Sequence, residues 1–298
     1  MNWNKVLNVF IAIFIVLNLF LYWYQNQYDK DRFTLTEKRE NQLSSIMAEE
    51  GVTIYEFIPN YFPMESLVLG EPGIDKENVI RTILGETYDI LLDDLNLGEK
   101  VTSGDESLIF YFGEQDGYVY YSSEGGHYVP ENMTLGQVEK VAKEFAIDLF
   151  GEDVQMEITV MTEVTDTEPN GLRIEMNEVY GRDQHKVFQT FIKLFITREG
   201  VLEALAVRYP PIELSNEPKN IFAFDVVMYN LVYNLENELE ALKEEGQSKT
   251  IKDINVGYYL PDVDSKKLTY ELEPHYRVVF KDGDTFYINA YTNVITKP

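Results

Sequence analysis

The residue types that most often do chemistry in proteins are sparse and scattered in this sequence. Three histidines, His127, His185 and His275, lie far apart, without the spacing of a metal site or of a nucleophile–base pair. There is no cysteine, which excludes thiol nucleophiles, cysteine-bound zinc and iron–sulfur clusters. The motifs of serine hydrolases, zinc proteases, phosphate-binding loops and dinucleotide-binding folds are missing. We therefore predict that the protein is not an enzyme and has no catalytic residue, metal ligand or cofactor.

Carboxylates are abundant, but their arrangement does not mark a catalytic or metal site. The chain has 51 acidic residues, so paired carboxylates of the kind that glycosidases use are expected by chance. Asp282-Gly283-Asp284 resembles a fragment of a calcium-binding loop, but the rest of the ligand pattern is missing. Because Asp-Gly readily adopts positive φ, we predict a type I′ hairpin turn here.

The acidic composition limits the kinds of partner. With 51 acidic and 25 basic side chains, the formal net charge is -26. Such a surface repels phosphate backbones, so no nucleic acid is expected as a partner. The hydrophobic fraction of 45% is enough to bury substantial cores, and without cysteine the fold depends on packing alone.

A long apolar segment near the N-terminus determines how the rest of the chain is interpreted. From Val6 to Tyr28 no side chain is charged. As a helix, Val6–Tyr24 would span about 28 Å, close to the roughly 30 Å hydrocarbon core of a bilayer. The alternative is a cleaved secretory signal, but the apolar core is long and no small-residue cleavage site follows it. We predict an uncleaved, single-pass transmembrane anchor at residues 6–28.

Charges at the two ends of this segment indicate its orientation. Lys5 and the amino terminus precede it, whereas the charges that follow it cancel. Positive residues beside a membrane helix favour the cytoplasmic side. Residues 1–5 are therefore predicted to be a cytoplasmic tail at the cell membrane of a bacterium, and the C-terminal domain is predicted to be extracytoplasmic.

Two asparagines interrupt the apolar segment and are its best candidates for a function. On a helix, five residues fall within about 120° of one another: Asn8, Ala12, Ile15, Asn18 and Tyr22. An amide that faces lipid loses hydrogen bonds, and a bond to another helix recovers about 0.6–2 kcal/mol. We predict that these five residues contact a partner in the membrane. The alternative is that the helix tolerates its asparagines without any partner.

The region after the apolar segment begins with a helix. Thr34-Leu35-Thr36-Glu37 has the form of a capping box, and Glu37–Glu49 has the composition of a polar helix that ends at Gly51. We predict a juxtamembrane stalk helix at residues 29–50. An N-terminal α+β region is predicted at residues 51–133, with a strand at Val52–Phe57, a helix at Asp75–Leu84 and a hairpin of Ser107–Phe112 with Gly117–Ser122.

The second half of the chain contains the same succession of elements twice. Residues 134–215 begin with a second capping-box pattern at Thr134, followed by an amphipathic helix and four alternating segments: Gln155–Val164, Leu172–Tyr180, Lys186–Thr197 and Val201–Tyr209. Residues 216–298 begin with a helix to about Glu245, followed by five segments: Ile251–Leu260, Lys267–Leu272, Tyr276–Phe280, Thr285–Ala290 and Val294–Thr296. The predicted fold class is α+β, a single N-terminal transmembrane helix followed by two repeated helix-plus-antiparallel-sheet units.

Three places in the sequence resemble the YycI family of membrane regulators. They are the opening Met1–Lys5 together with the apolar run Phe14–Leu21, then Ile254–Tyr259 after the long helix, and finally Phe286–Val294 near the end. The resemblance covers essentially the whole chain. It departs from the family pattern at His275-Tyr276, where tryptophan is common, and at Asn293, where glycine is common. Because asparagine tolerates the left-handed conformation, the turn at Asn293 is expected to survive.

The resemblance implies a function without catalysis. YycI proteins accompany the WalK–WalR (YycG–YycF) two-component system, which controls bacterial cell-wall metabolism. The implied partners are a sensor histidine kinase of WalK/YycG type, a YycH-like protein and the membrane. Two alternatives remain open: an anchored extracytoplasmic ligand-binding domain that senses cell-wall material, and a wall hydrolase.

Overall fold

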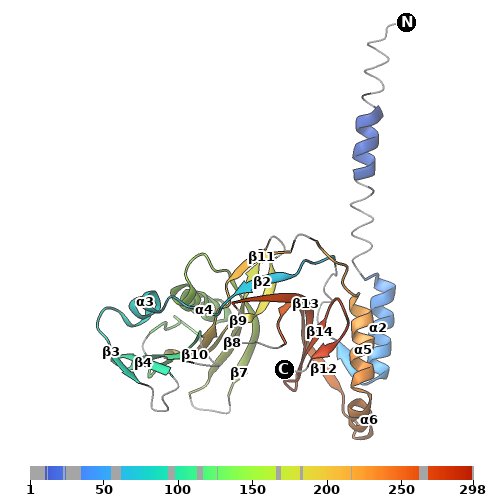
Figure 1. Cartoon of the computed structure of the whole chain (residues 1–298). Coiled ribbons are helices and arrows are strands. Elements are labelled where there is room, and N and C mark those ends of the chain that lie inside the picture. Colours follow the sequence, from blue (N-terminus) through green and yellow to red (C-terminus); the bar gives the residue numbers. More distant parts are fainter. Residues whose placement is uncertain are drawn as a thin grey trace. The chain divides into compact units, whose positions relative to one another are not determined.

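Strands account for most of the regular structure in the computed structural model of this protein (Figure 1). It describes residues 11, 13–22, 24, 35–54, 62–92, 98–112, 117–125, 127–165, 169–181, 184–215, 217–261 and 268–296. A 15-stranded sheet has the hydrogen-bonded order β11-β2-β13-β12-β9-β10-β6-β5-β4-β3, and β1, β7, β8, β14 and β15 pair off this path. Helices α2 to α6 and the π-helical turn η1 lie within the described residues, and residues 11, 13–22 and 24 are also helical.

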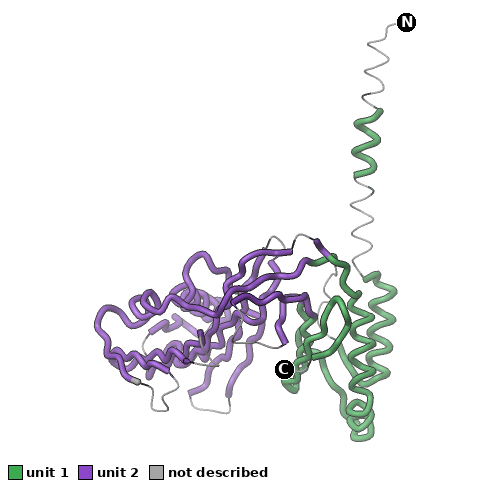
Figure 2. Tube along the Cα trace, in the orientation of Figure 1, with its two compact units in different colours: residues 1–64, 219–255, 276–298 green, residues 65–218, 256–275 purple. Residues whose placement is uncertain are grey.

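The chain divides into two compact units, and each combines segments that are distant in sequence (Figure 2). Unit 1 contains residues 1–64, 219–255 and 276–298, and unit 2 contains residues 65–218 and 256–275. The boundary expected between residues 133 and 134 falls inside unit 2. Strands β12 (Lys249–Tyr259) and β13 (Thr269–Phe280) each supply residues to both units.

Unit 2 contains a long antiparallel series of strands whose order is β3-β4-β5-β6-β10-β9-β8-β7. Their bounds are Asp89–Leu92 (β3), Gly98–Ser103 (β4), Glu106–Tyr111 (β5), Tyr118–Ser123 (β6), Met156–Val164 (β7), Gly171–Tyr180 (β8), His185–Thr197 (β9) and Gly200–Val207 (β10). Helix α4 (Leu135–Phe150) buries one face in the core of this unit. Val138, Ala142, Phe145 and Leu149 repeat at helical spacing and are 0–3% exposed, as their pattern predicted. Leu135, expected on the same face, is 65% exposed.

Smaller elements complete unit 2. A short helix, α3 (Lys76–Val79), continues into the π-helical turn η1 (Ile80–Leu84), and Asp75 caps the start of α3 through the backbone N–H of Asn78. Strand β2 (Leu67–Gly70) pairs on one side with β11 (Pro211–Leu214) and on the other with residues 269–272 of β13.

Unit 1 is built from helices α2 (Glu37–Glu49), α5 (Phe224–Asn234) and α6 (Glu236–Glu244) and from the strands β1 (Val52–Ile54), β14 (Thr285–Asn289) and β15 (Ile295–Thr296) with parts of β12 and β13. Helix α2 has the predicted bounds, but it is not a free stalk. Leu43 and Met47 are 0% exposed, and α2 lies beside α5 (Figure 1). The long helix predicted to reach about Glu245 is interrupted at Leu235.

The predicted fold class is wrong, because the strands do not form two repeated antiparallel units. Among the described residues, β1 pairs with β12 and β12 pairs with β9 in parallel. Strand β12 also changes partners along its length, since it pairs with β1 through residues 249–251 and with β9 through residues 257–258. Strand β13 continues through Pro274, where two strands were predicted. Its pairing with β2 ends at Leu272, so that ladder does not need the missing N–H of the proline.

The predicted transmembrane helix at residues 6–28 is not found either. Across the described positions, the structure contains no helix that is both long and apolar enough to cross a bilayer. Residues 1–10, 12, 23 and 25–34 of the predicted tail, anchor and stalk lie outside the described residues.

Local turn and cap predictions had mixed outcomes. Thr34, the capping residue of the first predicted capping box, lies outside the described residues, and the residue that directly precedes the helix, Thr36, makes no side-chain capping hydrogen bond. Thr134 makes none either, so the second predicted capping box is wrong. The turn at Asp282-Gly283 is not type I′, because only Gly283 has positive φ, at 98°. The prediction for Asn293 is confirmed, since its φ of 58° lies in the left-handed region.

Candidate functional site

The residues predicted to contact a partner lie on an exposed apolar helix. Asn8 and Ala12 are outside the described residues, and the structure places Ile15, Asn18 and Tyr22 on the helical run 13–22. The Nδ2 atom of Asn18 donates a hydrogen bond to the carbonyl oxygen of Phe14, at 2.8 Å. One donor of this amide is therefore used within its own helix, and the contact with a partner stays a prediction.

This helix exposes far more apolar surface than the rest of the described chain. We call its described residues, 11, 13–22 and 24, the apolar N-terminal segment. Its large apolar side chains are 49–73% exposed, from Ile11 at 49% to Tyr22 at 73%. Ile13, Val16, Leu17 and Phe20 line a wholly apolar groove along it. Such a surface is stable only when lipid or another protein covers it.

Helix α2, the next described helix, is fastened to unit 1 by charged contacts at both ends. Near its start, Arg39 donates through Nε (2.9 Å) and a terminal nitrogen (2.5 Å) to one carboxylate oxygen of Asp225 on α5. Asp225 is only 6% exposed, so this pair is partly shielded from water. At the other end, the Nζ atom of Lys243 on α6 lies 2.8 Å from Glu50. These two pairs hold α2 against α5 and α6.

A buried lysine joins three further elements of unit 1. Lys249, at the start of β12, is 5% exposed, and its Nζ atom lies 2.8 Å from Glu238, 2.8 Å from Asp282 and 2.6 Å from Asp284. The ammonium also lies 5.1 Å from the centre of the Phe280 ring. Desolvation by burial lowers the pKa of Lys249, but the hydrogen bonds to Asp282, Asp284 and Glu238 outweigh it and raise the pKa above its ordinary value. The Asp-Gly-Asp turn that resembled a calcium loop is thus occupied by a lysine of the same unit.

Unit 2 contains a second buried polar cluster, where the pairing of β8 with β9 slips. Asn177 of β8 pairs with Phe191 and the following Glu178 pairs with Val187, which leaves residues 188–190 of β9 as a bulge. Bulges of this kind are common next to binding and catalytic sites. The hydroxyl of Thr190, in the bulge, accepts from the backbone N–H of Tyr209 at 3.0 Å and so replaces a bond of the β9–β10 ladder.

The charged pair at this bulge is incompletely satisfied. Glu178 is 4% exposed, and one of its oxygens lies 3.4 Å from the guanidinium of Arg208. Among the described residues, Glu178 Oε2, Gln189 Oε1 and Arg208 Nε have no hydrogen-bond partner. Burial raises the pKa of Glu178, although Arg208 and Thr190 oppose this shift.

The three histidines stay separate in the structure. His127 is exposed, and its Nδ1 lies 2.8 Å from Glu106, which also accepts from the Tyr121 hydroxyl at 2.6 Å. His275 is buried, and desolvation lowers its pKa. His185 packs edge-on against Tyr258. No group of three or more potential ligands for a metal ion occurs in the portion of the chain that the structure describes.

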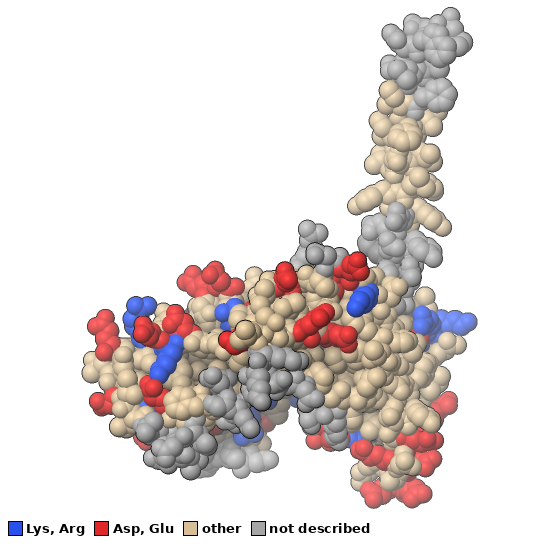
Figure 3. Space-filling model, in the orientation of Figure 1, with Lys and Arg blue, Asp and Glu red and all other residues tan. Residues whose placement is uncertain are grey.

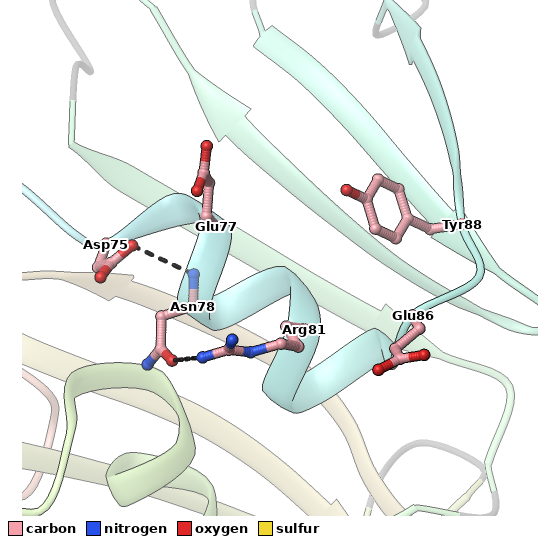
Figure 4. Close-up of a pocket in the computed structure, with 7 residues that line it drawn as sticks. Asp75, Glu77, Asn78, Arg81, Glu86 and Tyr88 are labelled. Atoms are coloured by element: carbon pink, nitrogen blue, oxygen red, sulfur yellow. Dashed lines mark hydrogen bonds between the residues drawn. The ribbon is translucent and has the colours of Figure 1, made fainter.

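A polar hollow of about 540 Å³ lies over α3 and η1 of unit 2 (Figure 4). Seven residues line it: Asp75, Glu77, Asn78, Arg81, Gly85, Glu86 and Tyr88. Asn78 Oδ1 accepts a hydrogen bond from Arg81 at 3.0 Å, while Glu86 and Tyr88 come from the segment that follows the π-helical turn. A π-helical turn is a frequent feature of functional sites.

Sequence analysis missed both buried charge clusters. Glu238, Lys249 and Asp282 are distant in sequence, and Glu178 and Arg208 fall in two different predicted segments, each of which has an ordinary alternating pattern. Asp282-Gly283-Asp284 resembled part of a calcium loop, but it was interpreted as a hairpin turn, and its contact with Lys249 was not predicted.

Comparisons with known proteins inform the fold and leave the function open. No family model matches the sequence, and no curated protein matches it. The structure is similar to the crystal structure of an uncharacterized protein from Eubacterium rectale ATCC 33656, with a TM-score of 0.52 and 11% sequence identity. The match covers 83% of this chain and 91% of that chain. At this identity, the likeness shows a shared fold alone.

Proposed function

We propose that the protein is a non-enzymatic regulator of a sensor histidine kinase of WalK (YycG) type. It acts at the cell membrane with a YycH-like protein, and the part of the chain that follows the apolar N-terminal segment is extracytoplasmic. The observation that carries the proposal is the apolar N-terminal segment, whose large side chains are 49–73% exposed and need an apolar environment. The resemblance of three sequence segments to YycI regulators supplies the identity of the partners.

The attachment of α2 to unit 1 supports a regulatory role for this segment. The contacts Arg39–Asp225 and Glu50–Lys243 hold α2 against α5 and α6. A partner that binds the units is then able to alter the position of the chain that precedes α2. A few kcal/mol of differential affinity for the two signalling states of the kinase would be sufficient to bias it.

A pull-down from bacterial membranes tests the proposal. The full chain is compared with a chain that lacks residues 1–28, and the recovered proteins are examined for a histidine kinase. Recovery with the full chain alone supports regulation through the N-terminal segment, and equal recovery moves the contact to the extracytoplasmic units. Recovery of no histidine kinase by either chain would overturn the proposal.

The role of the Asn18 amide is tested separately. In the full chain, Asn18→Leu is expected to weaken association with the kinase about 3–20-fold if the amide bonds to another helix. Val16→Leu, on a different face of the same helix, serves as the matched control. An unchanged association of the Asn18→Leu variant would remove this residue from the contact.

A second candidate function, sensing of cell-wall material, is favoured by the hollow over α3 and η1. Its carboxylates, amide, guanidinium and tyrosine are groups that hydrogen-bond and stack against amino sugars. We expect muropeptides to raise the unfolding temperature of the wild type, and Tyr88→Ala with Arg81→Ala to abolish that increase. No increase with the wild type would exclude this candidate.

A further inference from the structure

Helix α5 of unit 1 carries a line of large apolar side chains on its outer face. Val226, Tyr229 and Tyr233 are separated by three and four residues, so they lie along one side of the helix, and Phe222 lies in the extended segment just before it. They are 39%, 38%, 75% and 40% exposed, in that order. The opposite side is the buried core face, where Phe224, Met228 and Leu231 are 0% exposed. We call the four exposed residues the α5 ridge.

Ile46 of α2 extends this surface. Arg39 pairs with Asp225 near the start of both helices, and Glu50 pairs with Lys243 beyond their ends, so α2 and α5 run in the same direction. Ile46 and Tyr233 each lie about 10–12 Å along their helices from the Arg39–Asp225 pair, and they are therefore at the same level. Ile46 is 40% exposed.

The composition of the α5 ridge is that of a protein-binding surface. Single exposed apolar residues are ordinary, but aligned aromatic side chains are enriched where proteins meet. Phenylalanine and tyrosine provide large contact areas and lose little conformational freedom on binding, since they have few rotatable bonds. A ridge of this spacing fits beside a second helix.

Charge at the end of the ridge determines what kind of partner fits. Helix α6 follows α5 and carries exposed carboxylates at Glu236, Glu240 and Glu244, and Figure 3 shows acidic side chains gathered over this end of unit 1. The basic side chain of Lys243 is already paired with Glu50. A second copy of this chain would bring a like charge of -26 against these carboxylates.

We propose that the α5 ridge, with the acidic end of α6, is the docking surface for an amphipathic helix of a partner protein, with apolar residues on one face and lysine or arginine beside them. The apolar face covers Phe222, Val226, Tyr229 and Tyr233, and the basic residues meet Glu236, Glu240 and Glu244. This inference goes beyond the proposed function, because it holds whether or not the partner is a histidine kinase.

A synthetic helical peptide with leucines on one face and lysines on the flanks provides the test. Its binding to the full chain in phosphatidylcholine nanodiscs is measured by fluorescence anisotropy at low and physiological salt. We expect Tyr229→Ser with Tyr233→Ser to weaken binding about 10-fold or more. Glu236→Gln with Glu240→Gln is expected to weaken it about 3-fold and to reduce its salt dependence.

Matched substitutions on α4 of unit 2 provide the control. Ile147→Ser removes an apolar side chain that is 43% exposed, and Glu139→Gln with Glu144→Gln removes two carboxylates from the same helix. These variants are expected to bind the peptide within about 2-fold of the wild type. Equal weakening by the α4 and α5 variants would overturn the proposal, and so would unchanged binding by the α5 variants.

Other occupants of the ridge give distinguishable results. Sedimentation of the wild type as a dimer that Tyr229→Ser with Tyr233→Ser converts to a monomer would assign the ridge to a second copy. Quenching of the fluorescence near Tyr233 by labelled lipids in the nanodisc would show that the α5 ridge contacts the membrane surface. Either result would overturn the docking of a basic helix. Unchanged circular dichroism of each variant shows that its fold is intact.

Discussion

Lys249 in unit 1 and Glu178 in unit 2 are both buried charged residues, but their surroundings differ. Lys249 is 5% exposed and has three carboxylates within 2.8 Å of its Nζ atom. Glu178 is 4% exposed, and its charge partner, Arg208, lies 3.4 Å away. Its second oxygen has no hydrogen-bond partner in the described part of the structure.

The difference shows that the solvation of its partners determines whether a buried charge raises or lowers the stability of the fold. The carboxylates around Lys249 are 33–49% exposed, so only the ammonium loses most of its water, and its three donors are matched by three acceptors. Around Glu178, the side chain of Arg208 is only 26% exposed, so both charges are largely desolvated. We infer that the first cluster stabilises unit 1, whereas the second reduces the stability of unit 2.

Removal of the lysine is expected to have the largest effect. In Lys249→Met, three carboxylates converge without a cation, and we expect unit 1 to lose about 3 kcal/mol of unfolding free energy. Hydrogen exchange measured by mass spectrometry detects this loss as faster exchange in residues 249–255 of β12 and in β14, with β4 and β5 of unit 2 as internal references.

An exposed lysine provides the matched control. The side chain of Lys140 on α4 is 61% exposed and lies 3.7 Å from Glu144, so Lys140→Met should change stability by less than about 0.5 kcal/mol. If Lys249→Met lowered the unfolding free energy as little as this control, the three contacts of Lys249 would be ordinary surface pairs. The contrast between the Lys249 and Glu178 clusters would then be wrong.

The elements that sequence predicted best are those determined by local patterns. The bounds Glu37–Glu49 of α2 were predicted from composition and a terminal glycine, and α4 from its apolar period. The β5–β6 hairpin and strands β7 to β10 were found by alternation. The left-handed turn at Asn293 followed from the backbone tolerance of asparagine.

What the sequence did not predict depends on contacts between distant segments. Strand β12 pairs in parallel with both β1 and β9. The sequence did not predict this, because a strand can have the same alternating pattern of apolar and polar residues whether its neighbours are parallel or antiparallel. The slip between Asn177 and Glu178 is likewise determined by the partner strand. The local sequence around Lys249 does not distinguish it from an exposed surface lysine. Its contacts with Glu238 and Asp282 arise only when distant segments of the chain come together in the fold.

Neutralising Glu178 should give a smaller effect of opposite sign. Glu178→Gln removes a buried charge but keeps an acceptor for Arg208, so we expect unit 2 to gain about 1 kcal/mol at pH 7. Because the folded-state pKa of Glu178 is raised, its ionisation destabilises the fold only as the pH rises above its ordinary value of about 4.3. The gain should therefore disappear near about pH 4.

Glu175, on the same strand, tests whether the gain is specific. Its side chain is 25% exposed, and Glu175→Gln should change stability by less than about 0.5 kcal/mol at both pH values. Urea unfolding followed by circular dichroism measures both variants. A loss of stability in Glu178→Gln would mean that the contact with Arg208 outweighs desolvation, and the two clusters would then be alike.

The smallest expected effect separates the members of the Lys249 cluster. Asp282→Asn leaves Asp284 and Glu238 in place around the ammonium, and the side chain of Asp282 is 49% exposed, so we expect a loss of only about 0.5 kcal/mol at pH 7. Hydrogen bonds to Lys249 lower the pKa of Asp282, although its burial opposes this. The contribution of Asp282 is therefore complete above its ordinary pKa and is lost as the pH falls through the lowered value. Wild type and Asp282→Asn should thus converge in stability as the pH falls below the ordinary pKa of an aspartate. A difference that stays constant through this fall in pH would mean that Asp282 acts through the geometry of its turn and not through its charge.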